Sequence, residues 1–134
     1  MVTSATRVTS VTSLGRSGLS DWLIQRISGV ILLAYTVFIV AVLLGCSPGY
    51  AEWKALFDQT WMKVFSLAAV LSIAMHAWIG LWSVSTDYLI PYVLTVKLGS
   101  AAGAKANIVR WAFQAASAIV LFTYVVWGIQ ILWS

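Results

Sequence analysis

Long uncharged apolar runs alternate with short polar segments along the chain. The runs extend over 27–46, 64–86 and 111–133, and none of them contains Asp, Glu, Lys or Arg. A helix needs about 20 consecutive apolar residues to cross the hydrocarbon core of a bilayer. The pattern therefore predicts an all-α integral membrane protein with three transmembrane helices, at about 22–47, 63–88 and 108–133, within a membrane domain over 21–134.

The segments between the runs carry residues that end helices. Ser47, Pro48 and Gly49 follow the first run, and a connector over 50–63 has charges of both signs. A loop over 88–110 is broken by Pro91 and by two glycines. Tryptophans at 53, 61, 111 and 133 lie at the edges of the runs, as the aromatic belt of a membrane protein does.

The first 20 residues are rich in Ser, Thr and Val, and Arg7 and Arg16 are their only charged residues. This composition favours a flexible cytoplasmic tail, and an organellar transit peptide is the alternative. The letters LLGC at 43–46 resemble a lipoprotein cleavage site, which would remove the first helix and acylate Cys46. The apolar run before Cys46 is longer than a normal signal core, which favours a retained helix.

Composition excludes a water-soluble catalytic domain. Hydrophobic residues make up 61% of the 134 residues and charged residues 9%, and the mean hydropathy is +0.93. One cysteine rules out an internal disulfide and a cysteine-rich iron–sulfur site. Any chemistry must therefore take place in or at the membrane, through cofactors or partners.

Basic residues predict the orientation. With three spans, the N-terminus and the 88–110 loop share one side, which carries Arg7, Arg16, Arg26, Lys97, Lys105 and Arg110; the other side carries Lys54 and Lys63. The positive-inside rule then places the N-terminus in the cytoplasm and the C-terminus on the opposite, periplasmic side. The net charge of +4 thus marks topology rather than a nucleic-acid partner.

His76, the only histidine, lies near the middle of the second run. The stretch over 64–86 would span about 34 Å as a helix, so the imidazole sits deep in the bilayer. Ionisable groups at that depth usually face a bundle interior, where they pair, relay protons or bind a ligand.

Small residues surround His76 on its helical face, namely Ala69, Ser72, Gly80 and Ser83. One interpretation is close helix packing with a hydrogen-bonded histidine. The other is an axial haem ligand, with Gly80 leaving room for the porphyrin one turn away. The chain offers no well-placed second ligand, because Met75 points about 100° away and Cys46 is far from the midplane. A haem at His76 therefore requires a ligand from another polypeptide.

Asp87 and Tyr88 follow at the cytoplasmic edge, about 16 to 18 Å along the axis from His76. A carboxylate at a helix C-terminus opposes the macrodipole. The pair either marks the membrane boundary or binds a quinone headgroup, with the phenol donating a hydrogen bond to a carbonyl.

The run HAWIGLWSVSTDYLIP over 76–91 and the segment LGRSGLSDWLIQR over 14–26 resemble the D-type hydrophobic anchor subunits of bacterial succinate dehydrogenase, complex II. The three-helix pattern is similar across nearly the whole chain. The resemblance implies half of a heterodimeric haem-binding bundle, whose other half is the C-type cytochrome b anchor subunit. It implies that His76 ligates the iron of haem b and that Arg26 lies near its propionates. It also implies that Tyr88 binds ubiquinone with support from Asp87.

The same resemblance implies partners at the cytoplasmic face of the inner membrane, a flavoprotein subunit with FAD and an iron–sulfur subunit with its clusters. They oxidise succinate, which this chain does not do itself. Two features depart from the family pattern, a longer loop over 94–110 and Ile90 in place of a more polar residue. The rival functions are the anchor of a quinol:fumarate reductase and a cofactor-free three-helix scaffold.

Overall fold

The computed structural model describes residues 18–134, and every regular element in this range is an α-helix. Three of the helices are long and apolar enough to cross a membrane, which confirms the all-α class and the three predicted spans. Residues 1–17 of the predicted tail lie outside the described residues, and residues 18–20 belong to the first helix. The helices are α1 (Gly18–Cys46), α2 (Tyr50–Asp58), α3 (Thr60–Asp87), α4 (Pro91–Leu98), α5 (Ser100–Ala104) and α6 (Ala106–Leu132).

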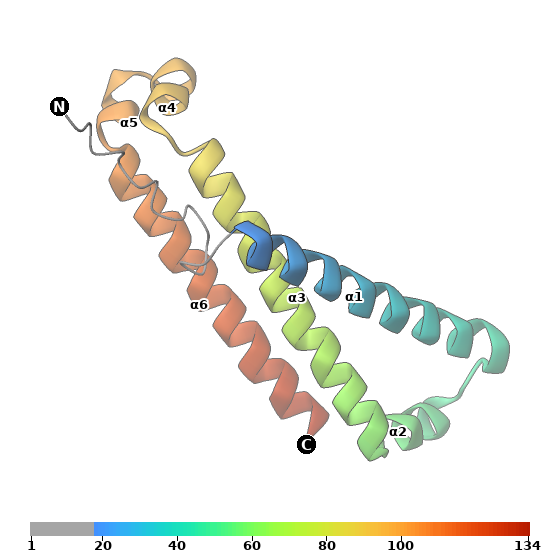
Figure 1. The fold of residues 1–134 in the computed structure, drawn as a ribbon. Coiled ribbons are helices and arrows are strands. Elements are labelled where there is room, and N and C mark those ends of the chain that lie inside the picture. Colours follow the sequence, from blue (N-terminus) through green and yellow to red (C-terminus); the bar gives the residue numbers. More distant parts are fainter. Residues whose placement is uncertain (1–17) are drawn as a thin grey trace.

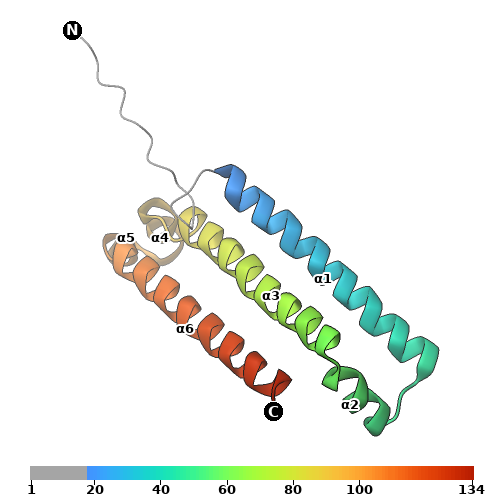
Figure 2. The ribbon, with the colours of Figure 1, turned by 60° about the horizontal axis from the view of Figure 1, so that its bottom comes forward.

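The central helix is α3, with α1 along one side and α6 along the other (Figure 1; Figure 2). Neighbouring long helices run in opposite directions, and α1 and α6 do not pack against each other to a comparable extent. The C-terminal end of α1 leans away from α3, with α2 below it (Figure 1). Because α1 has 29 residues, it is about 43 Å long, which a bilayer accommodates by tilting the helix or by leaving its ends at the interface.

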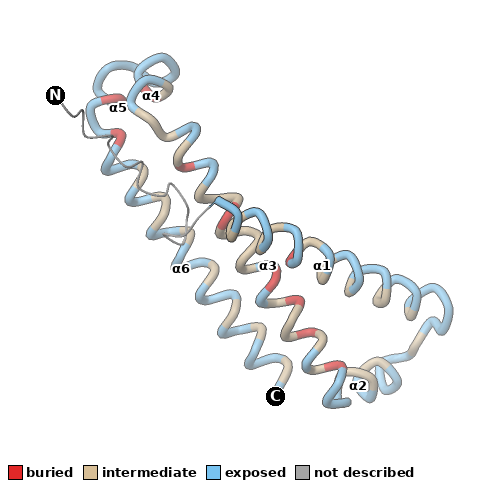
Figure 3. The backbone as a smooth tube through the Cα atoms, viewed as in Figure 1, coloured by how far each residue is buried: buried red, intermediate tan, exposed pale blue. Residues whose placement is uncertain are grey.

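The contact between α1 and α3 is made by small polar residues and by aromatic rings. The Tyr35 and Phe65 rings meet edge to face with centroids 5.0 Å apart, and the Tyr35 hydroxyl lies 3.0 Å from the Ser66 Oγ. The first four buried residues of α3 are spaced by three or four positions, so they share one face of the helix (Figure 3). The buried residues of α3 are Met62, Ser66, Ala69, Ser72, Ile79 and Ser85.

Burial is sparse in the other two spans. Within the described residues, Ser28 is the only buried residue of α1 and Ala106 the only one of α6. Most large apolar side chains on these two helices therefore face outward, as expected for a single layer of helices in lipid.

The loop expected over 88–110 instead contains two short helices. Pro91 stands in the first turn of α4, where its missing N–H leaves no carbonyl unpaired. Gly99 joins α4 to α5 with φ of 96°, a conformation that favours glycine. Residues that break a long helix thus mark the boundaries of short ones here.

The connector over 50–63 is also partly helical, because it contains α2. At the start of α2, the Gly49 N–H donates to Glu52 Oε2 at 3.0 Å.

Gly103→Ala is expected to loosen the pair formed by α4 and α5. The added methyl group would overlap the Thr95 side chain and lie 3.0 Å from the Pro91 carbonyl oxygen. Overpacking of this kind costs about 1–3 kcal/mol, against about 1 kcal/mol that alanine gains in helix propensity. Hydrogen exchange of the amides over 91–105 should therefore be faster than in the wild type.

Gly45→Ala is the matched control, because a methyl group there meets nothing within 4 Å. Equal exchange over 91–105 in Gly103→Ala and in this control would contradict the packing described for Gly103.

Candidate functional site

His76 lies within α3 and points toward the first turns of α1. Its Nδ1 is 3.1 Å from the Ser28 Oγ, and its Nε2 is 3.2 Å from the Gln25 Nε2. Ser28 is buried with 4% of its surface exposed. The single histidine therefore joins the first and second spans through both of its ring nitrogens.

The hydrogen bonds of Ser28 and Gln25 are consistent with one tautomer of His76. The Ser28 hydroxyl donates its one hydrogen to the Gln25 carbonyl oxygen at 3.1 Å, so its oxygen accepts from the ring and Nδ1 carries the proton. The Gln25 amide nitrogen has only hydrogens to offer, so Nε2 accepts from it with its lone pair. An imidazole held at Nδ1–H with a lone pair on Nε2 is the arrangement that metal-binding histidines use.

The Gln25 amide is only half satisfied. Its Oε1 is buried without a hydrogen-bond partner, although a buried amide oxygen normally has one. A glutamine side chain has three rotatable bonds, so turning it away from Nε2 gives up one hydrogen bond and can give Oε1 a partner. His76 can therefore exchange Gln25 for another group at Nε2 while Ser28 keeps the ring in place.

Gly29 of α1 lies beside the imidazole, and Gly80 lies one turn beyond His76 on α3. A Cβ on Gly29 would stand 3.9 Å from His76 Cε1, and a Cβ on Gly80 would meet nothing within 4 Å. This chain therefore leaves the space next to Gly80, one turn beyond His76, unfilled. A flat group bound to Nε2 needs such room.

Arg26 follows Gln25 on α1 and is exposed. Its guanidinium lies 5.2 Å from the centre of the Trp22 ring, a cation–π contact at the end of the span. Arg26 is thus next in sequence to Gln25, which contacts His76. Among the described residues, no contact joins Arg26 itself to the His76 ring.

Asp87 and Tyr88 form a separate site at the end of α3. Both are exposed, Tyr88 with 64% of its surface. The Tyr88 N–H donates to the Val84 carbonyl oxygen at 3.0 Å, which closes the last turn of the helix. Asp87 is eleven positions after His76 on the helix, which is about 16 Å along the axis. The structure keeps the two predicted sites apart, as the sequence spacing indicates.

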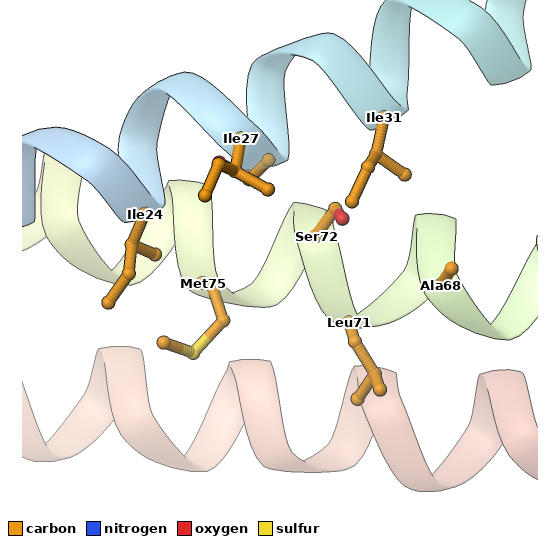
Figure 4. Close-up of a pocket in the computed structure, with 8 residues that line it drawn as sticks. Ile24, Ile27, Ile31, Ala68, Leu71, Ser72 and Met75 are labelled. Carbon is orange, nitrogen blue, oxygen red and sulfur yellow. The ribbon is translucent and has the colours of Figure 1, made fainter.

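An apolar groove of about 390 Å³ lies between α1 and α3, and Ser28, which contacts His76, is one of the residues that line it (Figure 4). Ile24, Ile27 and Ile31 of α1 border it from one side, and Met75 and Leu71 of α3 from the other. Met75 also borders a second groove, of about 370 Å³, between α3 and α6. Met75 therefore faces both grooves.

Within residues 18–134, no three His, Cys, Asp or Glu residues come together to hold a metal ion. A metal at His76 must therefore bring other ligands with it, as iron in a porphyrin does, and take a further ligand from outside this chain.

Sequence reasoning missed the α1 side of the site. Ser28 and Gly29 lie one turn after Gln25, near the start of the first span. The polar Ser28, next to a glycine, interrupts an apolar run. That interruption was the available signal for a helix contact. It does not tell which helix is contacted.

Comparison with known proteins shows what this chain is similar to. Residues 3–97 match the family described as succinate dehydrogenase/fumarate reductase transmembrane subunit, a range that includes His76, Asp87 and Tyr88. A succinate dehydrogenase hydrophobic membrane anchor subunit from Coxiella burnetii is 36% identical over 119 residues, which cover 88% of this chain and 90% of the relative.

Ser28→Ala is expected to weaken the contact between α1 and α3, because the His76 Nδ1–H would lose its acceptor inside the membrane. Interhelical hydrogen bonds in membranes contribute about 1 kcal/mol, so the midpoint of thermal unfolding in mild detergent should fall. Thr36→Val is the control, since the Thr36 hydroxyl bonds only the Leu32 carbonyl of its own helix. A midpoint equal to that of the control would argue against the Ser28–His76 contact.

Proposed function

This chain belongs to the family of succinate dehydrogenase/fumarate reductase transmembrane subunits, and on that premise we propose that it supplies one axial ligand of haem b and part of a ubiquinone-reduction site. It is a membrane anchor subunit and an integral membrane protein. The partners that such an anchor holds are a flavoprotein and an iron–sulfur subunit, which oxidise succinate at the cytoplasmic face.

The observation that carries the haem assignment is the state of the His76 ring. Nδ1–H is held by a buried serine, and the lone pair of Nε2 meets only the side-chain amide of Gln25. Gly80 leaves space for a flat ring system. Haem bound there would supply a one-electron redox centre within the membrane. Gln25 has to turn away for this, since its amide and the iron need the same lone pair.

The opposite axial ligand comes from a partner, the C-type cytochrome b anchor subunit. His76 is the chain's only histidine, and its only cysteine, Cys46, is exposed at the far end of α1. The outward-facing apolar side chains of α1 and α6 support this proposal, because a single layer of helices leaves much of its apolar surface for lipid and for a second subunit. The two subunits would thus complete one bundle around the haem.

Arg26 neutralises the haem propionates in this proposal. Its guanidinium now rests on Trp22, a contact that is weak enough at an exposed site to be given up for a carboxylate. Its neighbour in sequence, Gln25, already reaches His76, so α1 brings a cation to the cytoplasmic end of the haem site.

Tyr88 donates a hydrogen bond to a ubiquinone carbonyl, and Asp87 supports it at the aqueous edge. Both side chains are exposed in this chain, so they are accessible to a ligand that lies between subunits. Reduction of the quinone to a quinol consumes two electrons and two protons, and a site at the membrane surface can draw those protons from water. The basic residues at this end favour the cytoplasmic side.

The family description covers fumarate reductases as well, so an anchor that runs the reverse reaction is the second candidate. The direction depends on the reduction potentials of the quinone and the partner clusters. The cofactor-free scaffold accounts for the two hydrogen bonds of His76 but gives no use for the space beside Gly80.

His76→Ala is expected to remove or alter the haem spectrum of the purified complex, because the iron loses one axial ligand. The absorption spectrum of the oxidised and reduced complex measures this. Met75→Leu is the control, since Met75 faces the apolar grooves. If His76→Ala and Met75→Leu give the same reducible b-type spectrum as the wild type, His76 is not a ligand.

Tyr88→Phe is expected to slow quinone reduction by about tenfold, the effect of losing one hydrogen bond to the bound quinone of about 1.4 kcal/mol. Succinate oxidation with an artificial acceptor should be unchanged, since that reaction does not use the quinone site. Tyr92→Phe, at an exposed tyrosine four residues later, is the control. Equal loss of both activities would count against the quinone assignment.

A further inference from the structure

A buried hydrogen bond joins α3 to α6 close to Tyr88. The Gln114 Nε2 donates to the Ser85 Oγ at 2.9 Å, and the Ser85 hydroxyl donates to the Trp82 carbonyl oxygen at 2.8 Å. Ser85 has none of its surface exposed. Within residues 18–134, this is the only side-chain hydrogen bond between these two spans.

The bond lies where α3 ends, close to Asp87 and Tyr88. Gln114 is an amide inside an apolar span, where an unpaired polar group is costly. Ser85 lies in the last turn of α3, two residues before Asp87 and three before Tyr88. The other side-chain hydrogen bonds from α3 to a neighbouring span, at His76 and Ser66, lie farther down the helix.

Within α3, no residue after Ser85 is buried. Asp87 and Tyr88 are exposed, and α4 begins at Pro91, so no buried side chain fixes the last turn after Ser85. A helix end normally frays when its last turn has few buried contacts. The Gln114–Ser85 bond therefore ties the last turn of α3 to α6.

We propose that Ser85 and Gln114 are positioning residues for the quinone site, holding the last turn of α3 so that Tyr88 presents its hydroxyl to the quinone carbonyl. The inference rests on the proposed function of Tyr88. It assigns no contact between quinone and either residue.

The test uses the complete complex, purified from membranes, with Gln114→Met, Ser85→Ala and the double variant. Gln114→Met keeps the length of the side chain and removes its donor. Ser117→Ala is the matched control on α6, because the Ser117 hydroxyl donates to the Phe113 carbonyl of its own helix at 2.8 Å. Steady-state rates with a short-chain ubiquinone, rates with an artificial acceptor and the haem spectrum are measured for each.

Gln114→Met should raise the KM for quinone about fivefold, the effect of losing one interhelical hydrogen bond, with the artificial-acceptor rate and the haem spectrum unchanged. The double variant should be no worse than Gln114→Met, because both changes remove the same bond. If the complex does not assemble with Gln114→Met, Ser85→Ala tests the same hydrogen bond, because it removes only the hydroxyl that accepts it.

An unchanged KM in both single variants, or a parallel fall of every activity, would overturn the positioning role. Tyr88→Phe measured alongside separates the two proposals. If Tyr88→Phe impairs quinone reduction and the Gln114 and Ser85 variants do not, only the positioning role fails. If none of these variants changes quinone reduction, the quinone site itself is wrong.

Discussion

An imidazole inside a bilayer must find partners for both ring nitrogens within the protein, because no water is there to supply them. His76 meets this constraint through Ser28 and Gln25, one turn apart on α1. The need for these contacts fixes the rotation of α1 about its own axis and brings the two helices close at Gly29. The same contacts leave Nε2 as the acceptor, which is the atom that the proposed haem iron would bind.

The three spans form a layer rather than a closed bundle, with α3 between α1 and α6 (Figure 2). A layer has two broad apolar faces and little interior of its own, and the described part of α6 buries only Ala106. Such a chain is stabilised by what surrounds it, which is lipid and, in this family, other subunits. An anchor that shares a cofactor with a neighbour is one way to make that association specific.

Sequence reasoning predicted the three spans, because an uncharged apolar run of 20 residues or more is typical of a transmembrane helix and of little else. It also placed His76 on a small-residue face, and Ala69 and Ser72 of that face are buried. It could not identify Gln25 and Ser28, since a helical wheel shows which residues share a face and not which neighbouring helix that face meets. The helices within the 88–110 segment were missed because proline and glycine mark the start of a short helix as well as the end of a long one. The haem and quinone assignments stay predictions.

The most direct test is a structure of the complex isolated in mild detergent, at a resolution that shows the His76 ring. We predict iron at the His76 Nε2, the Gln25 amide turned away, Ser28 still at Nδ1, and a ligand from a second subunit on the opposite side of the porphyrin. A ring that still accepts from Gln25, with no porphyrin beside Gly80, would contradict the haem assignment.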